Sequence, residues 1–469
     1  MKVSPLIIFL IFCSIVLNAQ KQYTLQECIE TALKNNIRLK QVELNRQGAA
    51  IDVITSKGSM LPNLNASFSQ NFNFGRNIDP VTNAYIVNST QSTNMGLNSS
   101  VTLFNGFQLL NNLKLAKINY SASETDVTTL QNDLSLQVAA AFLQVMYAED
   151  NLTNTKSQLE LSQSQRNRID ILVKAGKLAE NALMDLDAQL ANDDYNVQVA
   201  QNAILSAKLT LIQLMELPAT TNFGIRRPAI ALPISETYDV NIIYEQSLNN
   251  RPEVKGAELR REAALMSEKI ALGGLSPRLS LSAGLNTLYS NKYRTYTGST
   301  FVGVYPIGIT QNTFDTVFAP EYRNNFSTVG FGDQLNQNFG KYVSLGLTIP
   351  LFNNFRVYGN IQRSKLNIQN QDLNLAQTRN VLLKSIQQAI TDVEAAKVKF
   401  RSAEKSLAAQ NASFNNTEIR YNQGLSSYLD FVTAKNNRAR AEINLQQARY
   451  DLILKSKIID FYRGNNITL

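Results

Sequence analysis

The feature that most constrains the fold of this chain is an internal repeat that spans most of its 469 residues. Identical residues recur in the two halves at two fixed offsets, 215 and 248 residues. The pairs are Leu33 with Leu248, Leu44 with Leu259 and Pro62 with Pro277 at the first offset, then Phe104 with Phe352 and Gly176 with Gly424 at the second. Such self-similarity predicts one structural plan used twice, so each element of the first half should have a counterpart in the second.

Four segments of about ten residues show the period-two alternation of a β-strand. They lie at 64–74, 94–104, 278–289 and 342–352. In the third, Leu279 and Leu281 flank Ser280, so one face is apolar and the other polar. This pattern is typical of outer-membrane strands, with lipid on one side and water on the other, and it also occurs in soluble β-sandwiches. Between the last two strands we expect a long polar loop over 290–340.

Long helical patterns fill the rest of each half. We expect helices at 25–60, 107–173 and 181–217 in the first half, and at 242–272, 355–422 and 427–463 in the second. Apolar residues in 107–173 recur in steps of three and four, as in a coiled coil. A helix of that length is about 100 Å long. Because isolated helices gain most of their stability from packing, it needs partners along its whole length.

Four strands cannot close a membrane barrel, because single-chain barrels begin at eight strands and open edges are excluded from hydrocarbon. Three chains would pool twelve strands, an even number that closes. Two shorter helices stacked end to end match one long helix, so each chain would supply four full-length rods. The predicted fold is therefore a mixed α and β membrane protein, a trimeric 12-stranded β-barrel that continues into a long α-helical barrel.

The chain begins with the features of a secretory signal peptide at 1–19. Lys2 precedes an apolar run of about 12 residues, and Ala19 supplies the small residue at the cleavage position. That run is too short to span a membrane. The predicted organisation is thus a signal peptide at 1–19, a first repeat at 20–240 and a second repeat at 241–469.

Composition excludes several classes of protein. The sequence has no His and only two cysteines, Cys13 and Cys28, which rules out His-dependent triads and His-ligated or thiolate-cluster metal sites. The net charge of +8 is scattered among acidic residues, without the basic run that marks a nucleic-acid site. No cluster of catalytic residue types occurs at motif spacing. We therefore expect neither an enzyme nor a cofactor, a metal or a nucleic-acid partner.

Short motifs in a fixed order carry a resemblance to the TolC family of outer-membrane efflux proteins. They are Tyr23-Thr24-Leu25-Gln26-Glu27-Cys28, Leu61-Pro62, Leu103-Phe104-Asn105-Gly106, Ser276-Pro277, Leu351-Phe352-Asn353-Asn354, Tyr421-Asn422-Gln423-Gly424 and Leu429-Asp430. The resemblance covers the whole mature chain. It implies an outer-membrane channel with its helices in the periplasm, a passive conduit of a tripartite efflux pump or type I secretion system. It further implies a homotrimer in outer-membrane lipid, a periplasmic adaptor and an inner-membrane pump as partners.

The resemblance also points to the turns between the long and return helices as adaptor contacts. The candidates are Ala175, Gly176, Lys177, Gln423, Gly424 and Leu425. Glycine at these positions also has an ordinary explanation, because it ends helices by accepting positive φ.

Residues just past the second turn match the positions that narrow the pore entrance in the family. Asp430 matches the first of two acidic positions, and the second falls on Thr433. Tyr421 matches a tyrosine that holds the entrance shut, and the arginine beside it is replaced by Ser426. Asp185, past the first turn, is a further candidate. Three Asp430 side chains around a threefold axis would attract cations, although an exposed carboxylate on a helix is the ordinary alternative.

The strands pass into the long helices through two short polar segments, which contain Asn105 and Gly106 in the first half and Asn353 and Asn354 in the second. We expect them to form a flexible turn that joins the barrel to the helices. Two rival functions remain open at this stage: a trimeric surface adhesin or fibre with a β-barrel anchor, and a soluble periplasmic coiled-coil adaptor. The sequence does not name the cargo.

Overall fold

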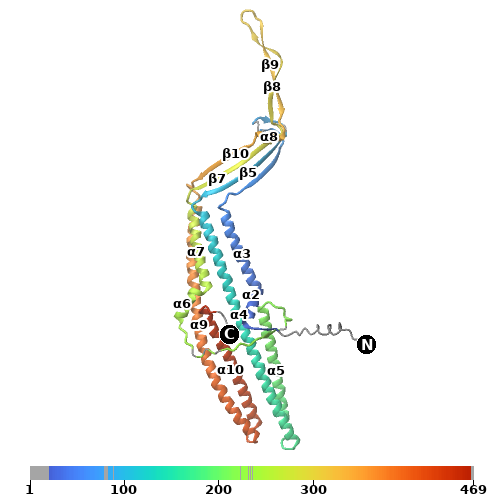
Figure 1. Cartoon of the computed structure of the whole chain (residues 1–469), viewed down its shortest axis with the longest axis vertical. Coiled ribbons are helices and arrows are strands. Elements are labelled where there is room, and N and C mark those ends of the chain that lie inside the picture. Colours follow the sequence, from blue (N-terminus) through green and yellow to red (C-terminus); the bar gives the residue numbers. More distant parts are fainter. Residues whose placement is uncertain are drawn as a thin grey trace, which may run out of the picture. The chain divides into compact units, whose positions relative to one another are not determined.

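A computed structural model describes residues 21–465, apart from 79–82, 88, 222, 231, 233 and 235. The predicted signal peptide at 1–19 lies outside the described residues. The chain divides into two compact units. The helical unit contains the chain up to Ala50, Lys117–Ala263 and the chain from Ile368, and the strand unit contains Ile51–Ala116 and Ala264–Asn367. Each unit takes segments from both halves, so the two repeats are not separate compact bodies (Figure 1).

The helices follow the predicted order. They are α2 (Leu25–Asn35), α3 (Ile37–Gly58), α4 (Gln108–Lys174), α5 (Asn181–Leu214), α6 (Val240–Asn250), α7 (Pro252–Gly273), α8 (Phe331–Gln337), α9 (Arg356–Asn422) and α10 (Tyr428–Tyr462). The two long helices α4 and α9 have 67 residues each. Among the described residues, none of the helices combines the length and apolar character that crossing a membrane requires.

Four strands form one antiparallel sheet in the order β10-β7-β5-β2. Their bounds are β2 (Asn65–Asn73), β5 (Thr90–Phe104), β7 (Arg278–Ser290) and β10 (Gly340–Thr348). The register places Val101, Leu281 and Leu345 in one apolar row across three strands. The neighbouring row, on the opposite face, is Ser100, Ser282 and Ser344. The sheet therefore has one apolar and one polar face, as the alternation predicts.

The fourth strand ends earlier than predicted. The alternation runs to residue 352, but β10 stops at Thr348. Pro350 lacks the N–H that a strand donates to its neighbour. The apolar alternation therefore continues for a few residues after the hydrogen-bonded pairing has ended.

The two helices that precede the strands are each broken, which corrects the prediction of single helices at 25–60 and 242–272. Asn36 separates α2 from α3 with a non-helical ψ of 122°, and Arg251 separates α6 from α7 with extended backbone. The breaks are 215 residues apart, the first repeat offset. Asn36 Oδ1 accepts a hydrogen bond from the Leu39 amide at 2.9 Å and so starts a new helix. Arg251 precedes Pro252, which disfavours helical backbone at the residue before it.

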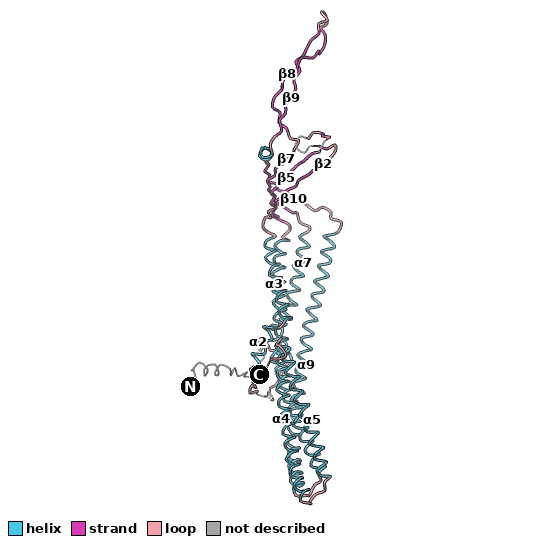
Figure 2. The backbone as a smooth tube through the Cα atoms, turned by 90° about the vertical axis from the view of Figure 1, so that its right-hand side faces the viewer, coloured by secondary structure: helices cyan, strands magenta, loops and turns pink. Residues whose placement is uncertain are grey.

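The segment predicted as a loop, 290–340, is mostly regular structure. It contains a hairpin of β8 (Arg294–Ile309) and β9 (Thr316–Thr328), followed by α8. Glycines at every fifth residue of β8 interrupt the period-two alternation, so the pattern looks irregular in the sequence. Figure 2 shows the hairpin leading away from the four-stranded sheet as a narrow ribbon.

Small strands also occur outside the main sheet. β1 (Lys21–Tyr23) pairs in parallel with β6 (Phe223–Ile225). β3 (Asn77–Ile78) pairs with β4 (Tyr85–Ile86). The return helix predicted to reach residue 217 ends at Leu214, because Glu216 adopts a φ of 53°.

Candidate functional site

The strand-to-helix junctions repeat one geometry in both halves. Each has two consecutive residues with positive φ, Gly106-Phe107 at 66° and 61° and Asn354-Phe355 at 52° and 58°. These pairs are 248 residues apart, the second repeat offset. The junction is therefore a defined left-handed turn rather than the flexible connection that the sequence suggested. Asn354 replaces glycine in the second copy, and asparagine is among the few residues that tolerate this backbone.

Aromatic rings bracket each of these turns. Phe104 and Phe107 meet edge to face at 5.4 Å, and Phe352 and Phe355 do so at 5.7 Å. The preceding asparagine caps the long helix: the Gln108 amide donates to the Asn105 carbonyl at 3.3 Å. In the second copy the Arg356 amide donates to the Asn353 carbonyl at 3.0 Å.

Close packing requires glycine at the first junction. A Cβ on Gly106 would lie 2.5 Å from the Gly273 carbonyl oxygen and 2.7 Å from Ser276. The Gln108 side chain also donates to the Ile270 carbonyl at 2.9 Å. The junction is thus fastened to the end of α7 within the strand unit.

The long helices α4 and α9 end in the same way, at the turns that lead into the return helices α5 and α10 (Figure 1). Gly176 and Gly424 have φ values of 69° and 74°. The Lys177 amide donates to the Leu172 carbonyl at 2.9 Å, and the Leu425 amide donates to the Arg420 carbonyl at 2.8 Å. With the bonds from each glycine amide, this is the Schellman arrangement that closes a helix. All six predicted contact residues, Ala175, Gly176, Lys177, Gln423, Gly424 and Leu425, are exposed.

Tyr421 lies in an aromatic cluster rather than beside an arginine five residues later. Its ring stacks on Phe431 at 4.9 Å, and Phe431 contacts Phe414 at 5.8 Å. Arg168 of α4 reaches the next residue, Asn422, and donates to its carbonyl at 3.3 Å and to its side-chain oxygen. Burial raises the pKa of the Tyr421 phenol, so it stays neutral at physiological pH.

Asp430 caps its own helix. Its Oδ2 accepts hydrogen bonds from the Ser427 hydroxyl at 2.7 Å, the Ser427 amide at 3.1 Å and the Ser426 hydroxyl at 3.1 Å. These hydrogen bonds, chiefly those from Ser427, hold the pKa of Asp430 below its ordinary value of 3.8. The carboxylate is exposed and therefore carries a full negative charge at neutral pH. Ser426, which stands where the family has an arginine, contacts Asp430 instead of Tyr421.

Asp185 contacts the start of α10 through its backbone carbonyl. The Tyr428 hydroxyl donates to the Asp185 carbonyl at 3.3 Å, which links the start of α10 to α5. Burial raises the pKa of Tyr428 to about 12, so the phenol keeps its donor proton. The Asp185 side chain and Thr433 are both exposed. Asp187, two residues on, pairs with Arg166 at 2.8 Å.

A buried polar cluster close to these residues escaped the sequence analysis. Lys435 Nζ lies 2.5 Å from Asp193 Oδ2, and their side chains are only 2% and 7% exposed. The Ser162 hydroxyl also donates to Asp193 Oδ2 at 2.5 Å and accepts from Lys435. Gln189 completes the set by donating to Asp193 Oδ1 at 2.8 Å. The available signal was a lysine four residues after Phe431, on the apolar face of its helix.

These four residues come from α4, α5 and α10, so the cluster fastens three helices together. It borders a cavity of about 260 Å³ with a mixed lining, which includes Asn151, Asn154 and Val199. Removing either partner of a buried charge pair leaves the other charge uncompensated, which strongly destabilises the fold. The cluster therefore fixes which helices pack beside one another behind the candidate entrance.

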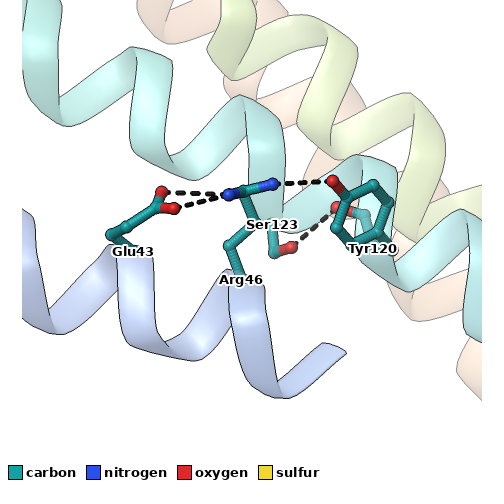
Figure 3. Close-up of polar contacts among 4 residues, drawn as sticks. All are labelled: Glu43, Arg46, Tyr120 and Ser123. Carbon is teal, nitrogen blue, oxygen red and sulfur yellow. Dashed lines mark hydrogen bonds and ion pairs between the residues drawn. The ribbon is translucent and has the colours of Figure 1, made fainter. Parts of the chain in front are cut away.

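Ion pairs fix the lateral order of the other helices in the helical unit. Arg46 of α3 binds Glu43 at 2.5 Å and donates to the Tyr120 hydroxyl of α4 at 2.6 Å (Figure 3). Within α4, the Ser123 hydroxyl donates a hydrogen bond to the backbone carbonyl of Tyr120 at 2.6 Å. Figure 3 shows Arg46 reaching from α3 to α4 between these groups.

The next helix in the row is α7. Arg260 of α7 binds Asp126 of α4, and on the other side Glu258 of α7 binds Arg379 of α9 at 2.8 Å. The order is therefore α3-α4-α7-α9. It matches the strand order β2-β5-β7-β10, because each strand is followed or preceded by the helix at the same place in the row.

A sequence model of the family described as outer membrane efflux protein matches residues 28–216 and 243–460. Toxin and drug export protein A of Aggregatibacter actinomycetemcomitans is 22% identical over 455 residues, covering 92% of this chain and 84% of that relative. Outer membrane protein TolC of Vibrio cholerae is 19% identical over 432 residues, covering 92% and 88%. The solved structure of the outer membrane protein VceC, also from Vibrio cholerae, has a TM-score of 0.74 at 17% identity and covers 95% of this chain and 97% of that one.

Proposed function

Because this chain belongs to the outer membrane efflux protein family, we propose that it is one of three identical subunits of a channel-tunnel. The protein itself is an outer-membrane efflux channel whose helices lie in the periplasm. The observation that supports the subunit number is the four-stranded sheet. Within the described residues, its edge strands β2 and β10 each pair on one side only. Unpaired backbone groups in hydrocarbon cost several kcal/mol each, so the sheet needs further strands.

Three copies supply those strands. β2 and β10 run in opposite directions, so joining β2 of one copy to β10 of the next keeps the antiparallel alternation. The result is a closed barrel of twelve strands with the apolar face outward. The match of the family model to two separate segments agrees with the duplicated plan that this barrel would repeat.

The edge helices carry the surfaces that such an assembly requires. Exposed apolar residues on α3 recur every seven residues at Ile37, Leu44 and Ile51. On α9, Leu366 and Leu373 are exposed and also seven residues apart. A seven-residue apolar repeat packs against another helix. We therefore place α3 of one copy beside α9 of the next, where β2 meets β10.

The channel would act as a passive conduit from periplasm to exterior. A periplasmic adaptor would contact the exposed turns at Gly176 and Gly424, and an inner-membrane pump would supply the energy. One relative is named for toxin and drug export. We extend that cargo class to this chain, as either an efflux pump component or a secretion outlet, and propose no catalytic step.

The proposal is tested by isolating the full-length protein from outer membranes and measuring its conductance in planar bilayers. We expect a crosslinkable trimer that conducts ions in discrete steps. A monomer recovered from the soluble periplasmic fraction would contradict the channel assignment, and a non-conducting trimer would favour an adhesin.

Charge at the entrance gives a prediction for Asp430. The gate we propose combines Asp430, Thr433, Tyr421 and Asp185. Asp430→Asn keeps an acceptor oxygen for the Ser427 cap and removes the charge. Block by divalent cations in planar bilayers should then weaken, because a ring of three carboxylates no longer attracts them.

The pH dependence of this block has a fixed direction. Hydrogen bonds, chiefly from Ser427, lower the pKa of Asp430, so the carboxylate and the block that depends on it should be present at neutral pH and be lost when acidification protonates it. Asp187→Asn, at a carboxylate paired with Arg166, serves as the matched control. Equal block in the wild type and in Asp430→Asn would exclude Asp430 from the gate.

A further inference from the structure

The β8–β9 hairpin is a regular ribbon with a five-residue repeat. The register between β8 and β9 shifts at Gly298, Gly303 and Gly308, so one extra residue is inserted before each glycine. Gly298 and Gly303 have φ values of 125° and 159°, within or at the limit of the range that side chains rarely adopt. Each bulge bends and twists the ribbon by a similar step. The evenly spaced bulges thus match a five-residue repeat on β8 to a four-residue repeat on β9: Tyr296, Phe301 and Pro306 lie opposite Phe326, Tyr322 and Phe318.

This register gathers large apolar side chains on one face, which we call the aromatic face. Its members are Tyr296, Phe301, Val304, Pro306 and Ile309 on β8, and Phe318, Pro320, Tyr322 and Phe326 on β9. Two ring pairs cross between the strands, Tyr296 with Phe326 at 5.9 Å and Phe301 with Tyr322 at 5.8 Å. From Tyr296 to Ile309 the face carries no charged side chain, whereas Glu321 and Arg323 point to the opposite face.

Within the described residues, nothing covers the aromatic face. Phe301 is 55% exposed and Tyr322 57%. A two-stranded hairpin alone is only marginally stable in water, and a ribbon with a large exposed apolar face needs a partner.

Lipid cannot be that partner. In the part of the chain that the structure describes, β8 and β9 pair only with each other, so both outer edges of the ribbon keep unpaired backbone groups. Such edges are not tolerated in hydrocarbon. The occupant must therefore be protein that can pack against the rings and leave the edges in water or pair with them.

The base of the ribbon is held in a fixed place. The Gln334 side chain, only 1% exposed, accepts from the Ser290 amide at 2.9 Å and donates to the Ser290 and Val329 carbonyls at 3.0 and 2.8 Å. This clamp joins the end of β7 to the end of the ribbon. Tyr289 and Phe331 reinforce it with a ring contact at 5.0 Å. The ribbon is thus anchored to the barrel strands, at the end of β7 away from α7.

We propose that the aromatic faces of three copies pack against one another and form a stalk at the outer mouth of the channel. The inference rests on the three-copy assembly proposed above. The ribbon is inserted between β7 and the edge strand β10, so it continues from the strand at which copies would meet. Nine half-exposed apolar side chains present roughly 700 Å² per copy, close to the ~800 Å² per partner of a stable interface. Antiparallel ribbons in a ring also bring β9 of one copy beside β8 of the next.

Single cysteines on the two faces of β9 test the stalk. Tyr322→Cys places a thiol on the aromatic face, and Glu321→Cys places one on the opposite face one residue away. The native Cys28 does not interfere, because it is buried and burial raises its pKa to about 12. Intact cells are treated with a short, membrane-impermeant bismaleimide. Because each copy carries one reactive thiol, the bismaleimide can link copies only in pairs. We expect Tyr322→Cys to give covalent dimers in several-fold higher yield than Glu321→Cys.

A parallel sample without crosslinker, run on a mild gel, shows whether the trimer itself is present. If the trimer is intact and Tyr322→Cys gives no more self-crosslink than Glu321→Cys, the stalk is wrong and the channel assignment stands. Exclusive crosslinking to another protein would equally overturn the stalk. Loss of the trimer in the wild type would overturn both proposals. Phe301→Cys, beside Tyr322 on the same face, repeats the test if Tyr322→Cys does not fold.

Discussion

Lys435→Met is expected to lower the free energy of unfolding by about 3–5 kcal/mol, the usual cost of removing one partner of a buried ion pair. The methionine fills much of the same volume, so the loss comes mainly from Asp193. That carboxylate would stay buried between α4, α5 and α10 with its charge uncompensated. Thermal unfolding of the detergent-solubilised protein, followed by circular dichroism, should show a midpoint lower by roughly 10 °C.

Two controls separate the buried charge from lysine in general. Lys174→Met removes a lysine that pairs with Asp170 at 2.7 Å and is 74% exposed. It should change stability by well under 1 kcal/mol, because exposed pairs contribute little. The double variant Lys435→Met/Asp193→Leu should regain most of the loss, since well-packed apolar residues can replace a buried pair at little cost. If the double variant is no more stable than Lys435→Met, the damage comes from packing and not from the orphaned charge.

The apolar face of the sheet supplies the second large effect. Leu345→Arg puts a charge in the middle of β10 on the face we assign to lipid, where Leu345 is 64% exposed in one copy. A charge near the midplane of the bilayer costs about 2–4 kcal/mol in a membrane barrel. We expect the amount of folded, heat-resistant trimer recovered from outer membranes to fall steeply. Quantitative gels of boiled and unboiled samples measure it.

Ser344→Arg is the matched control, because it inserts the same side chain one residue away. Ser344 lies opposite Ser282, on the polar face that would line the water-filled interior. Its trimer yield should stay near that of the wild type. Similar losses from both arginines would mean that the two faces do not meet different solvents, which would favour a soluble sheet.

Local patterns in the sequence were sufficient for the strands of the four-stranded sheet and for the long helices. Alternation identified β2 and β7 to within about a residue, because each has one uniform face over its length. It failed for β8, since an extra residue before every glycine resets the period. The break at Asn36 also escaped notice, because apolar spacing continues across it and only the cap geometry ends the helix.

The functional residues were harder to predict, because their roles depend on contacts between distant segments. Gly176 and Gly424 could be found from the repeat and from the backbone that glycine allows. The meeting of Ser162, Asp193 and Lys435 could not, since it requires knowing that α4, α5 and α10 share one core. Likewise, Ser426 looked like a lost partner of Tyr421 until the structure placed its hydroxyl on Asp430.

The unpaired edges of β2 and β10 also affect how a single copy survives before it assembles. A newly exported copy offers two unpaired edges to any chain it meets, and such edges are templates for misassembly. In the three-copy assembly proposed above, correct pairing and misassembly would compete for the same edges, so the outcome would depend on local concentration. β2 is adapted to this interval, because six of its nine residues are polar and it has no charge that would later oppose pairing. A polar, uncharged edge strand would keep a single copy soluble in water and would still allow it to pair with a neighbouring copy at the membrane.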